Sequence, residues 1–187
     1  MRTRTRFTVP ALALLLTASP LLAQGADPST ATGLRKEIVG QLADAEQKFV
    51  ALAEAMSQEK YAWRPAEGVR SVSELFVHVA GSNYMFPRMA GVERAPDVPL
   101  ARDAEKTIRD KAQIVELLRK SFAFAKQSVM DVPEAQLDSA VNMFGRATTK
   151  RGVLLTMATH DHEHLGQAIA YARSNGVVPP WSAAGGN

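Results

Sequence analysis

The chain has 187 residues, of which 46% are hydrophobic, and 22 lysines and arginines stand against 19 aspartates and glutamates. This size and composition are typical of one globular domain and exclude a disordered chain. The sequence has no cysteine, which excludes disulfide scaffolds, Cys-ligated zinc, iron–sulfur clusters and thiol nucleophiles. Any chemistry must therefore use histidines, carboxylates or hydroxyl groups.

The first 23 residues have the pattern of a secretory signal peptide. The chain begins with a basic segment that contains Arg2, Arg4 and Arg6, and an apolar stretch follows this segment. The apolar stretch, residues 7–23, ends on the small residue Ala23. We expect cleavage after Ala23, with Gly25 and Ala26 as alternative sites.

Removal of this leader would leave a mature chain without net charge. The leader carries three arginines and no acid, so 19 basic and 19 acidic side chains remain. Binding to a phosphate backbone requires a concentrated surplus of lysine and arginine, so we expect no nucleic-acid partner. The apolar stretch is shorter than the roughly 20 residues of a membrane span, which makes an uncleaved anchor the less favoured alternative. We expect an exported protein, periplasmic or secreted, with no stable membrane insertion after cleavage.

The mature chain is predicted to contain four long helices and no strand. In the first, apolar residues recur every three or four positions from Leu34 to Met56. The second begins at a capping box formed by Ser71 and Glu74 and extends to about Ala90. Residues 91–109 are predicted to form a long connection.

The third and fourth helices complete the pattern. Asp110 offers a cap for the third helix, which Pro133 closes, and a short helical turn is expected between Pro133 and Thr149. The fourth helix runs from about Lys150 to Asn175. Four amphipathic helices predict an all-α four-helix bundle over residues 33–181. Residues 24–32 are predicted to be a flexible linker, and residues 182–187 a loose tail.

The histidines fall on the second and fourth helices, and they are His78, His160, His162 and His164. His160 and His164 are four residues apart, so they project from one helix face at a spacing that one metal ion can bridge. His162 points to another face. The apolar rows of both helices place His78 and the 160/164 pair at core positions, where an unpartnered polar group costs about 1–3 kcal/mol. A shared metal ion removes this cost; alternatively, each imidazole bonds to a backbone carbonyl or a carboxylate.

Three neutral imidazoles would leave a fourth coordination position open, as in catalytic rather than structural sites. Such ligands suit one divalent transition metal, with Zn²⁺, Ni²⁺ and Fe²⁺ preferred and Cu²⁺ also compatible. A metal-bound water or thiol would become a nucleophile near neutral pH. Candidates to orient the imidazoles through hydrogen bonds are Asn83, Asp161, Glu163 and Gln167, although the two acids are expected to be solvated.

Several motifs resemble those of the DinB superfamily. They are Trp63-Arg64-Pro65, Ser71-Val72-Ser73-Glu74-Leu75-Phe76-Val77-His78-Val79-Ala80, His160-x-x-x-His164-Leu165-Gly166-Gln167, Tyr171-Ala172-Arg173-Ser174-Asn175-Gly176 and Pro179-Pro180. The resemblance implies an up-down-down-up bundle, often a homodimer, that holds one divalent metal on three histidines. By position these are His78, His160 and His164. His162 and Leu165 depart from the polar or aromatic residues that many relatives have beside the pair.

The predicted function is that of a metal-dependent hydrolase or thiol-dependent transferase that acts on a small molecule of unidentified structure. The alternative is a non-catalytic bundle that binds metal or a small ligand. A third class, a bundle with noncovalent haem, would use a histidine and one of Met85, Met89 and Met157 as axial ligands.

Overall fold

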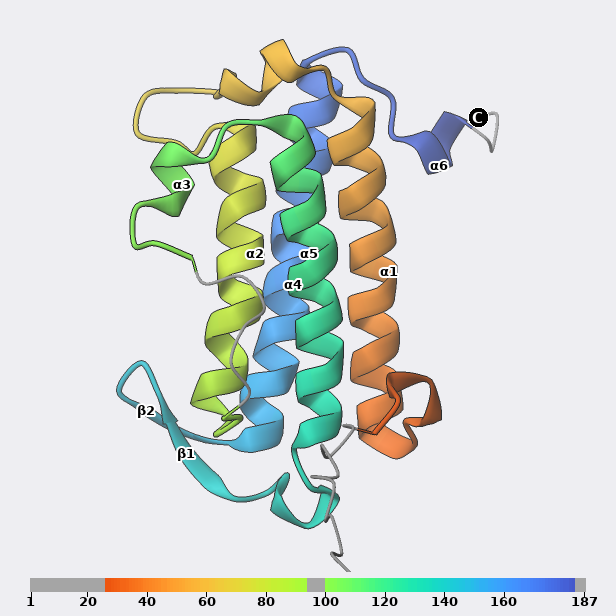
Figure 1. Ribbon diagram of the computed structural model, residues 1–187, viewed down its shortest axis with the longest axis vertical. Coiled ribbons are helices and arrows are strands. Elements are labelled where there is room, and N and C mark those ends of the chain that lie inside the picture. The colour runs from red at the N-terminus through yellow and green to blue at the C-terminus, as the bar shows by residue number, and fades with distance from the viewer. Residues whose placement is uncertain (1–25, 94–99, 184–187) are drawn as a thin grey trace, which may run out of the picture.

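The computed structural model describes residues 26–93 and 100–183. Four long helices run along its length: α1 (Gly33–Ala55), α2 (Val72–Met89), α4 (Lys111–Asp131) and α5 (Lys150–Ser174). Successive directions are up, down, down and up, so α2 and α4 are parallel (Figure 1). The predicted four-helix bundle with this topology is confirmed. No described helix has the length and apolarity needed to cross a membrane.

Local hydrogen bonds explain where the long helices begin. The Ser71 hydroxyl accepts from the Glu74 amide, and the Glu74 carboxylate accepts from the Ser71 amide, so the predicted capping box is present. Asp110 caps α4 through the amide of Gln113, also as predicted. Gly176, with φ of +71°, lies just beyond α5 in the left-handed region that glycine tolerates.

The connections hold structure that the sequence pattern did not predict. A short helix α3 (Ala104–Thr107) interrupts the connection between α2 and α4. Strands β1 (Ala140–Met143) and β2 (Arg146–Thr149) form an antiparallel hairpin before α5, so the prediction of no strand was wrong. The predicted helical turn is the 3-10 segment Glu134–Gln136. Another short helix, α6 (Pro180–Ala183), begins at the second of two consecutive prolines.

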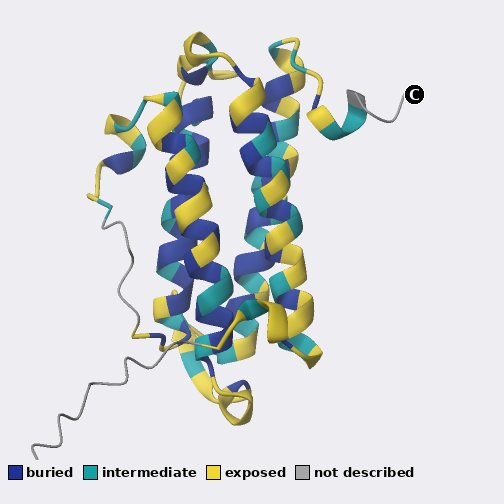
Figure 2. Cartoon of the chain, turned by 45° about the vertical axis from the view of Figure 1, so that its right-hand side comes forward, coloured by how far each residue is buried: buried dark blue, intermediate teal, exposed yellow. Residues whose placement is uncertain are grey.

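The core lies between the four helices, and buried residues occupy their inner faces (Figure 2). One apolar cluster includes Phe49, Phe76 and Phe122, and the ring of Phe49 contacts the rings of the other two. The second cluster includes Phe86 and Met157. Met85 and Met89 pack against this second cluster and are partly buried.

The flanking segments are described only in part. The leader, residues 1–23, lies outside the described residues, as do 184–187. Within the segment predicted as a linker, Pro28–Thr30 form a 3-10 turn capped by the Asp27 side chain. The Gln127 side chain of α4 donates a hydrogen bond to the Ala26 carbonyl.

Candidate metal centre

Helices α2 and α5 pack against each other and bring three histidines together. One ring nitrogen from each of His78, His160 and His164 lies within 4.8 Å of the others. We call these residues the three-histidine cluster. Each member is half-buried rather than enclosed in the core, so the cluster is accessible from solvent.

The spacing of the rings is compatible with a shared ion. His78 Nε2 and His160 Nε2 are 3.3 Å apart, which equals the separation of about 3.3 Å between two nitrogens bound tetrahedrally at ~2.05 Å from one metal. The ring centroids are 4.4 to 5.2 Å apart. The three ring nitrogens lie up to 4.8 Å apart. One ring would therefore have to move by on the order of 1 Å for all three nitrogens to bind the same ion.

In two of the three imidazoles, the Nδ1 nitrogen makes a hydrogen bond to a neighbouring side chain. His78 Nδ1 lies 2.8 Å from Glu105 Oε1, and His164 Nδ1 lies 2.9 Å from Gln167 Oε1. A carboxylate or amide oxygen accepts from Nδ1–H, which leaves the Nε2 lone pair directed away from that bond. His160 Nδ1 is buried and has no hydrogen-bond partner among the described residues. The donor set and the two Nδ1 contacts fit a divalent transition metal.

The environment favours neutral imidazoles. Burial, together with the neighbouring His164, His78 and Arg70, lowers the pKa of His160 to about 4. Burial also lowers the pKa of His78, although the hydrogen bond that His78 donates to Glu105 acts in the opposite direction. Neutral imidazole is the form that donates a lone pair to a metal.

Glu105 belongs to α3, and the sequence analysis missed its role. The residue lay in a segment that we predicted to be a long connection, and no sequence spacing relates it to His78, which is 27 positions away. Its second oxygen accepts from Arg70 Nε at 2.8 Å. Burial acts to raise the pKa of Glu105, but the hydrogen bonds from Arg70 and His78 outweigh it and lower the pKa.

Among the other candidates to orient the imidazoles, only Gln167 does so within the described residues. Asn83 is buried and donates to Ser121, and Glu163 is exposed as predicted. Asp161 is fully buried, with no hydrogen-bond partner for either oxygen in the described part of the chain. The prediction that Asp161 is solvated was therefore wrong, because it lies on the core face of α5.

His162 faces away from the cluster, as its position in the helix predicts. It lines a separate groove together with Leu34 and Ile38 of α1 and Leu155 of α5. This residue is therefore a matched control for substitutions of the three-histidine cluster.

Comparison with known families is consistent with this architecture. Residues 41–168 match the model of the DinB superfamily. An uncharacterised protein, YjoA from Bacillus subtilis (strain 168), is 28% identical over 129 residues, which are 67% of this chain and 80% of YjoA.

Solved structures share the fold. The crystal structure of the DinB-like YjoA has a TM-score of 0.61 at 24% identity, covering 76% of this chain and 93% of that one. A DinB-like protein from Bacillus cereus ATCC 10987 reaches 0.67 at 14% identity, covering 78% and 95%. YfiT from Bacillus subtilis, described as a probable metal-dependent hydrolase with an unusual four-helix bundle topology, reaches 0.61 at 15% identity, covering 83% and 97%.

Proposed function

The chain belongs to the DinB superfamily, and from this premise we propose that it binds one divalent metal ion through His78, His160 and His164 and acts as a metal-dependent hydrolase or thiol-dependent transferase. Zn²⁺, Ni²⁺ and Fe²⁺ are the preferred ions, because neutral imidazole suits all three. The observation that carries the proposal is the convergence of three ring nitrogens within 4.8 Å from two helices.

The residues around the cluster favour metal binding over a purely structural role. Glu105 and Gln167 accept from Nδ1 of His78 and His164, the arrangement that fixes the tautomer of metal-binding imidazoles. When bound on three histidines, a divalent ion supplies an open position at which water or a thiol loses a proton near neutral pH. The half-buried position of the rings allows a small molecule to reach that position.

The description of YfiT as a probable metal-dependent hydrolase supports hydrolysis as one of the two reaction classes. The other reaction class, thiol-dependent transfer, is supported by the resemblance of the histidine motifs to those of thiol-dependent DinB-like enzymes. A non-catalytic bundle that binds metal or a small ligand is the alternative. It predicts bound metal that neither azide nor a thiol can reach.

The haem alternative has less support from the packing. Met157 is fully buried in the second apolar cluster, and Met85 and Met89 pack against the same cluster. The histidine nitrogens instead face one another. A Soret absorption band in the purified protein would favour haem over this proposal.

We further propose that the protein is exported to the periplasm or secreted, which the leader sequence supports. Mass spectrometry of protein recovered from outside the cytoplasm should show cleavage after Ala23, Gly25 or Ala26. An intact leader on protein retained in the cytoplasm would contradict export. This result would leave the proposal for the three-histidine cluster unaffected.

Elemental analysis tests the metal proposal. Purified wild-type protein, dialysed mildly, should contain about one equivalent of transition metal, and H78A, H160A and H164A should each lose most of it. H162A should retain the wild-type content, because His162 lines another groove. Metal content well below one equivalent in the wild type, or unchanged content in H160A, would contradict the proposal.

A further inference from the structure

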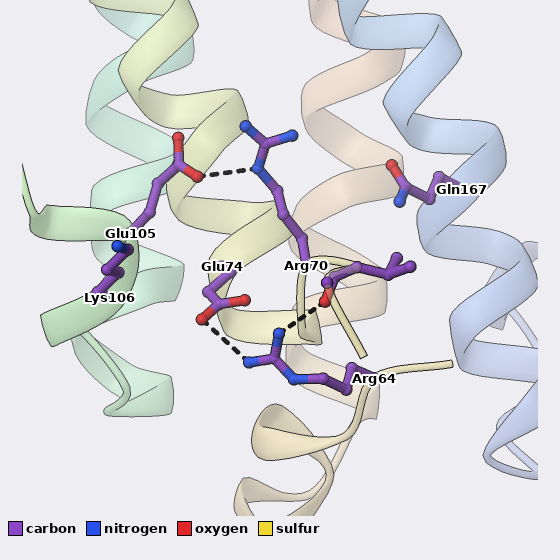
Figure 3. A pocket seen from close by; sticks show the side chains of 8 residues that line it. Arg64, Arg70, Glu74, Glu105, Lys106 and Gln167 are labelled. Atoms are coloured by element: carbon purple, nitrogen blue, oxygen red, sulfur yellow. Dashed lines mark hydrogen bonds and ion pairs between the residues drawn. The ribbon is translucent and has the colours of Figure 1, made fainter. Parts of the chain in front are cut away.

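A pocket adjoins the three-histidine cluster and is lined largely by charged side chains. It has a volume of about 580 Å³, within the range of small-molecule sites. Figure 3 shows Arg70 between Glu105 of α3 and Gln167 of α5, with Arg64 and Glu74 at one end of the pocket. Lys106 completes the charged lining.

The charges around the pocket do not cancel. Glu74 accepts from Arg64 and from Arg109, both at 3.1 Å, so two cations already serve this one carboxylate. Glu105 accepts from Nε of Arg70. The terminal guanidinium nitrogens of Arg70 and the exposed ammonium of Lys106 have no hydrogen bond or ion pair with residues 26–93 or 100–183. Donors and positive charge therefore remain available in the pocket.

The same residues connect the pocket to the histidines. Glu105 contacts Arg70 with one oxygen and His78 with the other, each at 2.8 Å. Gln167 lines the pocket and holds His164. The path from Arg70 Nε to His78 Nε2 consists of the two hydrogen bonds to Glu105, the width of the carboxylate and the width of the imidazole ring. The two nitrogens therefore lie within about 10 Å of each other. A small molecule can therefore contact both groups at once.

We propose that this pocket binds a carboxylate of the substrate through Arg70 and Lys106 while the reacting group of the same molecule reaches the three-histidine cluster. A guanidinium recognises a carboxylate with paired hydrogen bonds, and an ammonium adds a point charge. A singly charged carboxylate suits the site better than a doubly charged phosphate, because Glu74 and Glu105 also line the pocket and repel added negative charge. This inference rests on the proposed function, since it requires an accessible metal ion.

The test uses Co²⁺-loaded full-length protein and two probes of the same shape. 3-Mercaptopropionate carries a thiol and a carboxylate, and 3-mercaptopropionamide replaces the carboxylate with a neutral amide. The thiolate-to-cobalt absorption band reports binding of either probe at the metal without any assay of activity. We expect the carboxylate probe to bind wild-type protein about tenfold more tightly than the amide.

R70Q and K106Q should each reduce this preference to about twofold or less. In K106Q the affinity of the amide probe should also stay within about twofold of wild type. K106Q leaves the Arg70–Glu105–His78 contacts in place, so it tests the pocket without disturbing the histidines. K36Q is the control for charge, because Lys36 is exposed on α1 and is not part of the pocket. It should keep the full preference.

The possible results separate the two proposals. Equal affinity for both probes in the wild type, or a preference that persists in R70Q and K106Q, overturns the carboxylate pocket and leaves the metal proposal standing. If neither probe produces the cobalt band, the accessible metal site itself is wrong and the pocket inference is overturned with it.

Discussion

Glu105 and Gln167 each hold one imidazole of the three-histidine cluster by its Nδ1 nitrogen. These bonds restrict ring rotation and keep the Nε2 lone pairs free for a metal. Sequence spacing could predict the second contact, because Gln167 follows His164 by three positions on one helix. Sequence spacing could not predict the contact between Glu105 and His78, because it depends on the tertiary packing of α3 against α2.

E105A should weaken Zn²⁺ binding by about tenfold or more, since loss of such a hydrogen bond to a metal ligand has this effect in other sites. The affinity is measured by competition with a chromophoric chelator. E163A is the control, because Glu163 is exposed on the helix that carries His160 and His164. Equal affinity in E105A and E163A would contradict a positioning role for Glu105.

Asp161 is fully buried without a hydrogen-bond partner among the described residues, and burial raises its pKa well above 3.8. A carboxyl group with a raised pKa in the folded state makes the protein less stable as the pH rises through the interval between the unfolded and folded values. D161N removes the titration and should therefore stabilise the metal-free protein at pH 7 by about 1–3 kcal/mol.

Urea unfolding at several pH values measures this effect. The advantage of D161N should shrink as the pH falls and should disappear below 3.8, where the Asp161 carboxyl is protonated in both the folded and the unfolded state. E163Q, on the exposed face of the same helix, should show no comparable trend. An advantage that is independent of pH, or that grows in acid, would be inconsistent with a buried carboxyl group that resists ionisation.

The helix α2 depends on its first turn for the position of His78. The capping box of Ser71 and Glu74 fixes where α2 begins, and Glu74 also binds Arg64 and Arg109 from the flanking connections. The beginning of α2 is therefore tied both to the segment before it and to the beginning of α4. Loss of the cap would loosen the end of α2 that borders the charged pocket.

S71A should lower the free energy of unfolding by about 1 kcal/mol, because it removes the acceptor for the Glu74 amide. Thr32 offers a matched control, since it precedes α1 at the same position but makes no capping bond with its side chain. T32A should change the free energy of unfolding by less than about 0.5 kcal/mol. Equal effects of the two substitutions in urea titrations would contradict the importance of the capping box.

The long helices were predictable because periodicity and caps are local properties of the sequence. Helix α5, for example, was expected from Lys150 to Asn175 and spans Lys150–Ser174. The hairpin was not predictable from its turn, because the position before Gly145 is Phe144, which has a φ of +51°. Asparagine, aspartate or glycine usually occupies such a position in a two-residue hairpin turn, so the usual sequence signal is missing.

In the whole molecule, a metal ion at the three-histidine cluster would connect α2 to α5. These helices are far apart in the sequence, and only the tertiary fold places their histidines together. The shared face of His160 and His164 could be predicted from sequence, but the histidines are half-buried rather than at the predicted core positions, and the distance between the two helices was not predictable. Homodimer formation remains a prediction from family resemblance.

Because the unfolded chain lacks the assembled site, Zn²⁺ should stabilise the folded protein by about 2.7 kcal/mol at a free concentration one hundred times its Kd. Thermal and urea unfolding with and without Zn²⁺ measure this gain. H162A should show the wild-type gain, whereas H160A should lose most of it. Equal stabilisation of H160A and H162A would mean that the ion binds elsewhere.

The coordination itself is tested most directly by X-ray absorption spectroscopy of the Zn²⁺-loaded full-length protein. We predict a first shell of nitrogen or oxygen atoms at about 2.0–2.1 Å, with scattering from three imidazole rings in the wild type. H78A should show two rings, and H162A should retain three. A spectrum without imidazole scattering, or one that is unchanged in H78A, would contradict the claim that His78, His160 and His164 share one ion.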